Sequence, residues 1–402
     1  MIEVKNNMIL PEGFTLSGVH AGIKKVKLDM AVIKSDVPCT SGSAYTTNRV
    51  KAAPVVYDMS IKGTPKLGVV MNSGNANACT GEKGYADTVA MAEKAAELLG
   101  GTSSDYFIAS TGVIGVPLPM DKIMAGIESA ASSLGSDEEH MNACSDAVLT
   151  TDTHRKCVSA VFDIDGKTVT VTGFAKGSGM IHPNMATTLS FVMTDAAVTD
   201  EVLQKLVGES VDDTFNMISV DGDTSTNDSC FVLANGKSGV ECSKGEAYIF
   251  FASALKEVLR GLAKLLVKDG EGAEKFIEVK VNGAKDNKSA KVLARSVVSS
   301  SLVKAAFFGS DANWGRILCA MGYSGAEFDP SKVDLYFTSA AGKIQTLKGG
   351  EPLAFDEDVA KKILLEKEVG VIAELADGTA SAEAWGCDLT YEYVRINGDY
   401  RS

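Results

Sequence analysis

Short apolar runs alternate with amphipathic stretches along the whole chain. The run KLGVVMNSG, residues 66–74, ends in a Gly/Asn turn, which predicts a buried strand. The Ala-rich segment 84–101 predicts a helix that ends at its terminal glycine pair. Apolar and polar residues alternate with period two near Asp165-Gly166, so we expect a β-hairpin there. These patterns together predict a mixed α/β fold.

The second half of the chain continues this mixture of elements. Residues 199–216 predict a helix, and the runs 229–236 and 277–283 predict strands. We also interpret VLARSVVSSSLVKAAFFG, residues 292–309, and DLTYEYVRING, residues 388–398, as strands. No internal repeat or low-complexity linker marks a domain boundary.

Two further helices are predicted with more local detail. Asp121 is expected to cap the helix in DKIMAGIESAASSLG. The segment 249–270 is the most apolar long stretch, but it carries four cations at i+4 spacing, which predicts a solvated face on an amphipathic helix. These cations are Lys256, Arg260, Lys264 and Lys268.

Composition narrows the class of protein. Of the 402 residues, 45% are hydrophobic and 23% are charged, as in ordinary globular proteins. The net charge is −13 and no Lys/Arg-rich block occurs, so neither nucleic acid nor a membrane surface is an expected partner. The N-terminal residues resemble no secretory signal and no apolar run is long enough to span a bilayer, so we expect a cytoplasmic protein.

Metal and disulfide chemistry are not expected. The eight cysteines are scattered without a C-x-x-C pair, and the four histidines form no zinc motif. Asp221, Asp223 and Asp228 faintly resemble a calcium loop, but the EF-hand spacing and its final Glu are absent. A polar turn that supports a strand is the better interpretation of these aspartates.

The candidate chemistry lies in KGSGMIHPNMATTLSFVMTDA, residues 176–196, where Thr187 precedes an apolar strand without a Ser-His or Cys-His signature. A hydroxyl needs a nearby base to act as a nucleophile. The α-amino group of the same residue, with a reference pKa of about 7.7–8.0, provides one if the chain is cut before Thr187. Attack of the Thr187 hydroxyl on the Ala186 carbonyl, followed by ester hydrolysis, would make that cut.

Several separated motifs carry a resemblance to a known family. The chain resembles the ornithine acetyltransferase (glutamate N-acetyltransferase) family of arginine biosynthesis from end to end. The motifs are GIKKVKLDMAVIKSD, TTNRVKAAPV, NSGNANACTG, STGVIG, TTDT, KGSGMIHPNMAT, MISVDGDTSTNDS, LVKDGEGAEKF, SDANWGRILCAMGYSG and VRINGDYRS. The resemblance implies an N-terminal-nucleophile-like α/β fold with paired mixed sheets and flanking helices.

The resemblance also implies roles for individual residues. Thr187 corresponds to the nucleophile, and cleavage at Ala186–Thr187 would give an α chain of residues 1–186 and a β chain of residues 187–402. Thr111 and Gly112 correspond to the oxyanion hole. The implied substrate contacts are Thr153, Lys176, Thr187, Glu271, Asn397 and Ser402.

The implied reaction is a two-step acetyl transfer. Thr187 would take the acetyl group of N2-acetylornithine and pass it to glutamate by ping-pong kinetics, without a metal or organic cofactor. Some members of the family also accept acetyl-coenzyme A, and members assemble as α₂β₂; nothing in this sequence decides either property or a role outside primary arginine synthesis. The alternative is a hydrolase of the related N-terminal-nucleophile aminopeptidases, against which Lys176, Glu271 and the INGDYRS tail argue.

Overall fold

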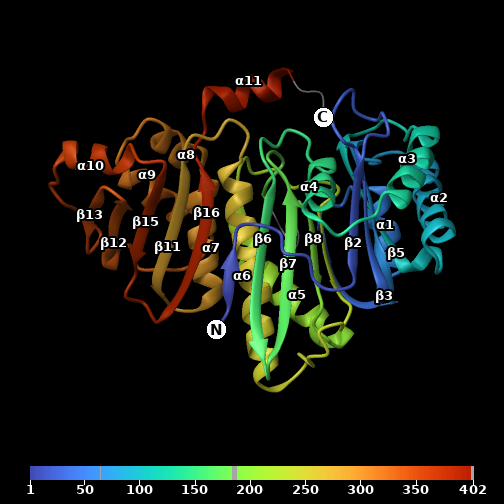
Figure 1. The fold of residues 1–402 in the computed structure, drawn as a ribbon. Helices are drawn as coiled ribbons and strands as arrows, with labels where there is room; N and C mark the ends of the chain where they lie inside the picture. Colours follow the sequence, from blue (N-terminus) through green and yellow to red (C-terminus); the bar gives the residue numbers. More distant parts are fainter. Residues whose placement is uncertain (64, 183–187, 400–402) are drawn as a thin grey trace.

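The computed structural model describes residues 1–63, 65–182 and 188–399, in which two mixed β-sheets flank one long helix (Figure 1). Thr187, Ala186 and Ser402 lie outside the described residues. Within the described residues the first sheet has nine strands, in the order β1-β6-β7-β8-β10-β3-β4-β5, with β2 also paired to β3. They are β1 (Glu3–Lys5), β2 (Phe14–Val19), β3 (Met30–Tyr45), β4 (Lys66–Asn75), β5 (Tyr106–Val113), β6 (Lys156–Ile164), β7 (Lys167–Lys176), β8 (Leu189–Thr194) and β10 (Ser229–Ala234).

The second sheet is built almost entirely from the C-terminal third of the chain. Its order among the described residues is β14-β13-β12-β15-β11-β16-β9. The strands are β9 (Ile218–Ser219), β11 (Phe276–Ala284), β12 (Asp334–Ser339), β13 (Gly342–Lys348), β14 (Glu351–Pro352), β15 (Glu368–Glu374) and β16 (Ala380–Cys387).

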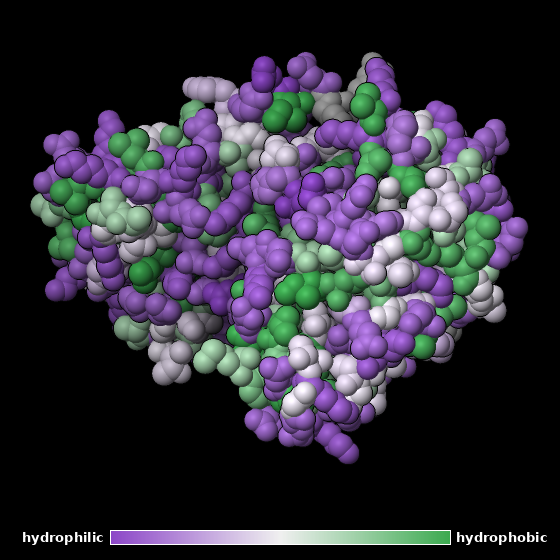
Figure 2. Space-filling view, viewed as in Figure 1, coloured by the Kyte–Doolittle hydropathy of each residue, from purple (hydrophilic) through white to green (hydrophobic). Residues whose placement is uncertain are grey.

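Helices pack on both sheets, and one long helix lies between them (Figure 1). They are α1 (Ala53–Ser60), α2 (Gly81–Leu99), α3 (Met120–Ser132), α4 (Glu138–Ala147), α5 (Asp200–Asp213), α6 (Gly245–Lys268), α7 (Asn287–Ser299), α8 (Ser301–Phe308), α9 (Trp314–Gly322), α10 (Glu357–Leu364) and α11 (Tyr391–Asp399). None of the helices within the described part of the chain is both long and apolar enough to cross a membrane. Figure 2 shows polar side chains over most of one face of the molecule.

Most of the predicted elements are confirmed, and the hairpin is confirmed in detail. Strands β6 and β7 pair in antiparallel register from Ile164↔Lys167 onward, and both turn residues have positive φ, as a tight hairpin turn requires. The parallel strands β8 and β10 are buried along their whole length. Their central residues, 191–193 and 231–233, are all apolar, as is typical of strands covered on both faces.

Two strand predictions are wrong, because both segments are helical. Residues 292–309 fall in α7 and α8, where Leu293, Ala294, Val297 and Val298 are buried at i, i+1, i+4 and i+5 spacing on one helix face. Asp286 begins α7 by accepting a hydrogen bond from Ser289 N at 2.7 Å. Residues 388–398 lie largely in α11, a short helix in which none of the described side chains is buried.

One local prediction about helices is wrong, and another is only partly right. Pro119, rather than Asp121, is the N-cap residue of α3. The cationic face of α6 is not simply solvated, because it lies against the second sheet: Lys264 pairs with Glu278 at 2.9 Å and Lys268 with Glu368 at 2.5 Å. Arg260 pairs with Glu383, and its guanidinium lies 5.6 Å from the ring centroid of Trp385.

Helix α6 therefore packs on both sheets, with apolar residues toward β6 and β7 and cations toward the second sheet.

We expect Leu262→Ala to lower the free energy of unfolding by about 2–5 kcal/mol, because Leu262 is fully buried and truncation leaves a cavity. Leu302→Ala is the matched control, since Leu302 is 62% exposed and should change stability by less than about 0.5 kcal/mol. Urea unfolding measures both, and equal losses would contradict a core between the sheets.

Candidate functional site

Two residues near the end of β5, Thr111 and Gly112, line a small cavity. Gly112 has φ +133°, and a Cβ at this position would lie 2.3 Å from the carbonyl carbon of Gly74, so only glycine fits. Thr111, next to it, is buried, and its hydroxyl accepts a hydrogen bond from Lys176 Nζ at 3.1 Å. Because Lys176 occupies the oxygen of this hydroxyl, the hydroxyl proton can be donated to a ligand.

The cavity brings together five of the residues predicted from sequence. It has a volume of about 100 Å³ and is lined by Thr111, Gly112, Lys176, Glu271 and Asn397. A second cavity of about 30 Å³ adjoins it, sharing the walls formed by Thr111 and Lys176. These residues come from β5, β7, the loop after α6 and α11, so the site is assembled from distant parts of the chain.

Glu271 and Asn397 form one wall of the cavity. Asn397 Nδ2 donates to Glu271 Oε2 at 2.8 Å, so α11 is tied to the loop that follows α6. The backbone nitrogen of Glu271 donates to Ser178 O at 3.0 Å. A Cβ on Gly179 would lie 2.5 Å from the Glu271 carboxylate, which explains the glycine in the approach KGSG.

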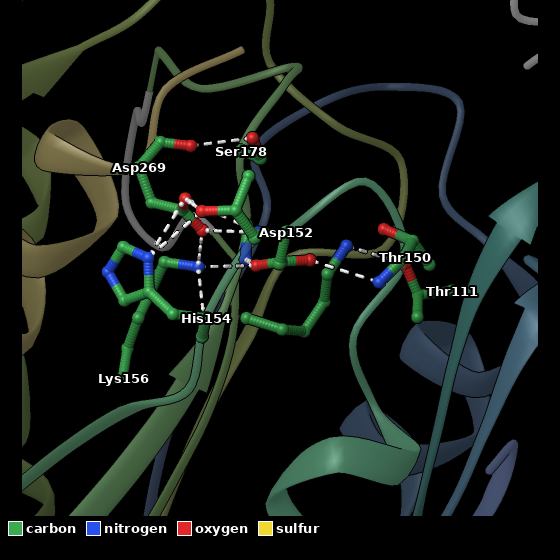
Figure 3. A network of polar contacts seen from close by, with 10 residues as sticks. Thr111, Thr150, Asp152, His154, Lys156, Ser178 and Asp269 are labelled. Carbon is green, nitrogen blue, oxygen red and sulfur yellow. Dashed lines mark hydrogen bonds and ion pairs between the residues drawn. The ribbon is translucent and has the colours of Figure 1, made fainter. Parts of the chain in front are cut away.

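A buried ion network lies beneath this wall (Figure 3). Lys156 is fully buried, and its amine donates to Asp152 at 2.6 Å and to Asp269 at 2.5 Å. Asp152 also accepts hydrogen bonds from Gly177 N at 2.7 Å and from Thr150 N at 3.0 Å. Burial raises the pKa of Asp152, but the charges of Lys176 and Lys156 more than offset this, so its pKa lies well below the ordinary value.

Thr153 is placed differently from the other predicted contacts. Its backbone nitrogen donates to Asp269 at 3.1 Å, its hydroxyl also donates to Asp269, and the side chain is exposed. The cavity is lined instead by its neighbours Thr150 and Thr151. A direct contact of Thr153 with substrate stays a prediction.

Carboxylates hold both flanks of the segment 183–187. On one side, Asp221 accepts hydrogen bonds from Met180 N at 2.8 Å and Ile181 N at 2.9 Å. On the other side, Asp228 accepts one from Thr188 N at 2.8 Å. Ile181 and Thr188 both line the smaller cavity, so the chain enters and leaves the undescribed segment beside Thr111 and Lys176.

A larger cleft of about 530 Å³ lies elsewhere, between α6 and the strands β11 and β16. Its charged walls are compensated: Lys256 pairs with Asp213 at 2.6 Å, and Lys280 pairs with Glu383 at 2.8 Å. Among the described residues, none lines both this cleft and the cavity at Thr111. Size alone therefore does not identify the functional site.

Comparison with known proteins decides the family. The ArgJ family matches residues 15–402. The chain belongs to the ArgJ family. It is 52% identical over 400 residues to the arginine biosynthesis bifunctional protein ArgJ of Caldanaerobacter subterraneus subsp. tengcongensis, covering 98% of both chains. It is 45% identical over 397 residues to the glutamate N-acetyltransferase of Methanopyrus kandleri, covering 98% of this chain and 100% of the relative.

A solved structure of an ArgJ protein supports the same assignment. The bifunctional protein from Bacillus halodurans is 44% identical, with a TM-score of 0.50, and the match covers 52% of this chain and 98% of the solved chain. The family resemblance carried by the sequence motifs is thus confirmed, as is the mixed α/β fold with two sheets.

The sequence did not predict the buried ion network that supports this ArgJ site. Asp152 lies between hydroxyl residues in TTDT, and that combination was the only signal for it. The sequence contained no signal for Lys156 or Asp269, since these two residues are partners that lie 113 residues apart in the chain. Asp221 and Asp228 are anchors of a polar turn, as interpreted, and no metal-binding group of three His, Cys, Asp or Glu occurs among the described residues.

Lys156→Met tests the buried network. We expect a loss of about 3–5 kcal/mol in the free energy of unfolding near pH 7, because Asp152 and Asp269 would stay buried without their shared cation. The exposed Lys205→Met is the control and should cost less than about 1 kcal/mol.

The pH dependence of the Lys156→Met effect follows from the pKa of Asp152. In the wild type this pKa is depressed, so the stabilisation is present above the unfolded pKa of about 3.9 and is lost as the pH falls below it. In the variant, protonation instead relieves a buried charge. The free energies of unfolding of wild type and Lys156→Met should therefore differ less at pH 4 than at pH 7. Urea unfolding of both proteins at the two pH values measures this difference.

Proposed function

We propose that this chain is a glutamate N-acetyltransferase of arginine biosynthesis, which moves an acetyl group from N2-acetylornithine to glutamate through an acetyl ester on Thr187. The observation that carries the proposal is the hydrogen bond from Lys176 to Thr111, two residues that line one cavity with Thr188, the residue that follows Thr187. Gly112 lines the adjoining cavity with the same two residues. Relatives covering nearly the whole chain are named for arginine biosynthesis and for this transfer.

Processing at Ala186–Thr187 would give the nucleophile a free α-amino group and divide the chain into residues 1–186 and 187–402. Thr188 has φ +81°, a conformation that is strained for a β-branched residue and typical of functional sites. The solved Bacillus halodurans chain is covered almost completely by about half of this one. A cut before Thr187 would leave a C-terminal chain of slightly more than half of the 402 residues, which agrees with that length.

The proposed chemistry uses groups of the chain itself. The Thr187 hydroxyl attacks the acetyl carbonyl carbon of N2-acetylornithine and loses its proton to the α-amino group. The oxyanion that forms receives hydrogen bonds from the Thr111 hydroxyl and the Gly112 N–H. The amide C–N bond then breaks, and the departing ornithine amine takes the proton. In the second half of the reaction the amine of glutamate attacks the acetyl ester, the ester bond to Thr187 breaks, and the Thr187 hydroxyl takes back a proton.

The charged walls suit an α-amino acid. Lys176 can neutralise a carboxylate, while Glu271, held by Asn397, can accept hydrogen bonds from an ammonium or amide N–H. Both amino acids would use this cavity in turn, as a ping-pong reaction requires. The proposed reaction needs no metal or organic cofactor. We propose that the enzyme acts in the cytoplasm as an α₂β₂ assembly. Acetyl-coenzyme A would serve as a second acetyl donor to the same threonine.

The denatured intact mass of the purified protein tests processing and donor together. We expect two fragments separated at Ala186–Thr187, with one acetyl group added to the larger fragment after brief exposure to N2-acetylornithine. A parallel incubation with acetyl-coenzyme A tests the second donor. Fragments that turn over N2-acetylornithine to acetate without transfer to glutamate would favour the hydrolase alternative, and an uncut chain would refute the nucleophile.

Thr111→Val tests the oxyanion hole, because valine keeps the shape of threonine but has no hydroxyl. We expect kcat to fall about 10²–10³-fold with little change in KM for N2-acetylornithine, the effect typical of losing one oxyanion donor. Thr346→Val is the matched control: Thr346 is also buried, lies in β13 of the other sheet, and has no hydrogen-bond partner for its hydroxyl among the described residues. Steady-state kinetics of both variants decide the matter, and an unchanged kcat in Thr111→Val would remove Thr111 from the mechanism.

A further inference from the structure

The first sheet folds over on itself at the long strand β3. Residues 30–34 of β3 pair with β4, whereas residues 40–45 pair with β10. The two halves of the sheet pack on each other: Phe107 of β5 stacks on Phe231 of β10, with ring centroids 4.6 Å apart, and both rings belong to one buried apolar cluster. Strand β5 is therefore brought beside β10 by apolar packing and not by strand pairing.

This packing brings Thr111 to the site without fixing its exact position. Thr111 in β5 lines the smaller cavity with Lys176, at the end of β7, and Thr188, just before β8. The pairing of β5 with β4 is also irregular here, because its register shifts between Gly74 and Asn75, which lie opposite the end of β5. Ladder hydrogen bonds therefore do not by themselves hold the end of β5 against the other half of the sheet.

Asn227 makes a polar contact between the two halves at this point. It lies in the loop that precedes β10, and its side-chain Nδ2 donates to Ser110 O at 2.8 Å and to Ala76 O at 2.6 Å. Ser110 directly precedes Thr111 in β5, and Ala76 directly follows β4. One amide from the β10 side thus holds the ends of two strands of the other half.

The orientation of the Asn227 amide is determined by its partners. Its Oδ1 accepts a hydrogen bond from Thr226 Oγ1 at 2.6 Å, and the residue is 6% exposed. The two backbone carbonyls can only accept, so the nitrogen of the amide must face them. Asn227 lines both cavities of the site, but both protons of its NH₂ group are bound to the backbone. It therefore acts on a ligand through the residues it holds.

We propose that Asn227 is a positioning residue of the oxyanion hole, which holds the Ser110 carbonyl and thereby fixes the Thr111 hydroxyl where the oxyanion forms. This inference rests on the proposed function. The peptide that joins Ser110 to Thr111 is planar, so a hydrogen bond on its carbonyl also sets the direction in which Thr111 leaves the strand. Lys176 then binds the hydroxyl oxygen at 3.1 Å, on a backbone that is already in place. A displacement of about 1 Å is enough to lower a rate about 10²-fold.

Asn227→Leu tests this role, because leucine has a similar volume but no donor for the two carbonyls. We expect kcat, expressed per cut chain from the denatured mass, to fall about 10–10²-fold. KM for N2-acetylornithine should change less than about threefold, since the oxyanion donors act mainly in the transition state. Asn216→Leu is the matched control and should retain the wild-type kcat: Asn216 is also 6% exposed, and it is not among the described residues that line either cavity.

A double variant separates positioning of Thr111 from general structural support. If Asn227 acts through the Thr111 hydroxyl, little of its effect remains once that hydroxyl is gone. We therefore expect Asn227→Leu to lower the kcat of the Thr111→Val enzyme less than about threefold. A merely structural effect would be independent of the hydroxyl, and Asn227→Leu would then lower kcat about 10–10²-fold in both backgrounds.

Failure of this role is distinguishable from failure of the proposed function, because cleavage and acetylation of the wild type are measured first. A wild type that is neither cut nor acetylated refutes the proposed function. With a competent wild type, the role of Asn227 is overturned by a wild-type kcat in Asn227→Leu, by effects that multiply in the double variant, or by a folded Asn227→Leu that is cut less than Thr111→Val. If Asn227→Leu is insoluble, Asn227→Ser, whose short side chain cannot reach both carbonyls, is measured against the same criteria.

Discussion

The arrangement of the site depends on one buried cation, Lys156, and the two carboxylates that share it. Asp152 belongs to the loop before β6 and Asp269 to the C-terminal end of α6, so the amine of Lys156 fixes the position of a loop and a helix end relative to the first sheet. Asp152 in turn holds Gly177 N, the first residue after β7. Buried ion pairs contribute little net stability compared with apolar packing, but removing one member is costly. We therefore interpret this network as a device that fixes geometry, and the geometry it fixes is that of Lys176 and Glu271.

The two sheets have different tasks in this arrangement. The first sheet carries Lys176 at the end of β7 and Thr188 just before its paired neighbour β8, and it carries Thr111 in β5, the last strand of the order. The second sheet contributes no strand residue to the cavity. It instead forms ion pairs with the cationic face of α6, for example Lys264 with Glu278, and thereby supports the helix whose end carries Asp269 and the Glu271 loop. The second sheet also leads through β16 into α11, from which Asn397 reaches Glu271.

The sequence predicted the residues with chemistry better than the residues that support them. The family resemblance implied roles for Thr111, Gly112, Lys176, Glu271 and Asn397, and the structure brings all five to one cavity. The supporting network was not predictable, because Lys156 and Asp269 become neighbours only through the packing of α6 on β6. The failed strand predictions have local causes. In 292–309, the valines favoured a strand prediction, although the apolar residues also have the helical spacing that the buried residues of α7 follow. In 388–398, the alternation of polar and apolar residues suggested a strand, but these residues form a helix without a buried face.

The anchors around the proposed cleavage site explain how a chain can be cut there and remain an enzyme. Asp221 holds Met180 and Ile181 on the N-terminal side, and Asp228 holds Thr188 on the C-terminal side, through hydrogen bonds that do not involve the scissile bond. The strands β7 and β8, which precede and follow this segment, are paired with each other from Lys176↔Leu189 onward. A cut between Ala186 and Thr187, as proposed, would leave these hydrogen bonds and this strand pairing in place, so both flanks of the segment would stay beside Thr111 and Lys176.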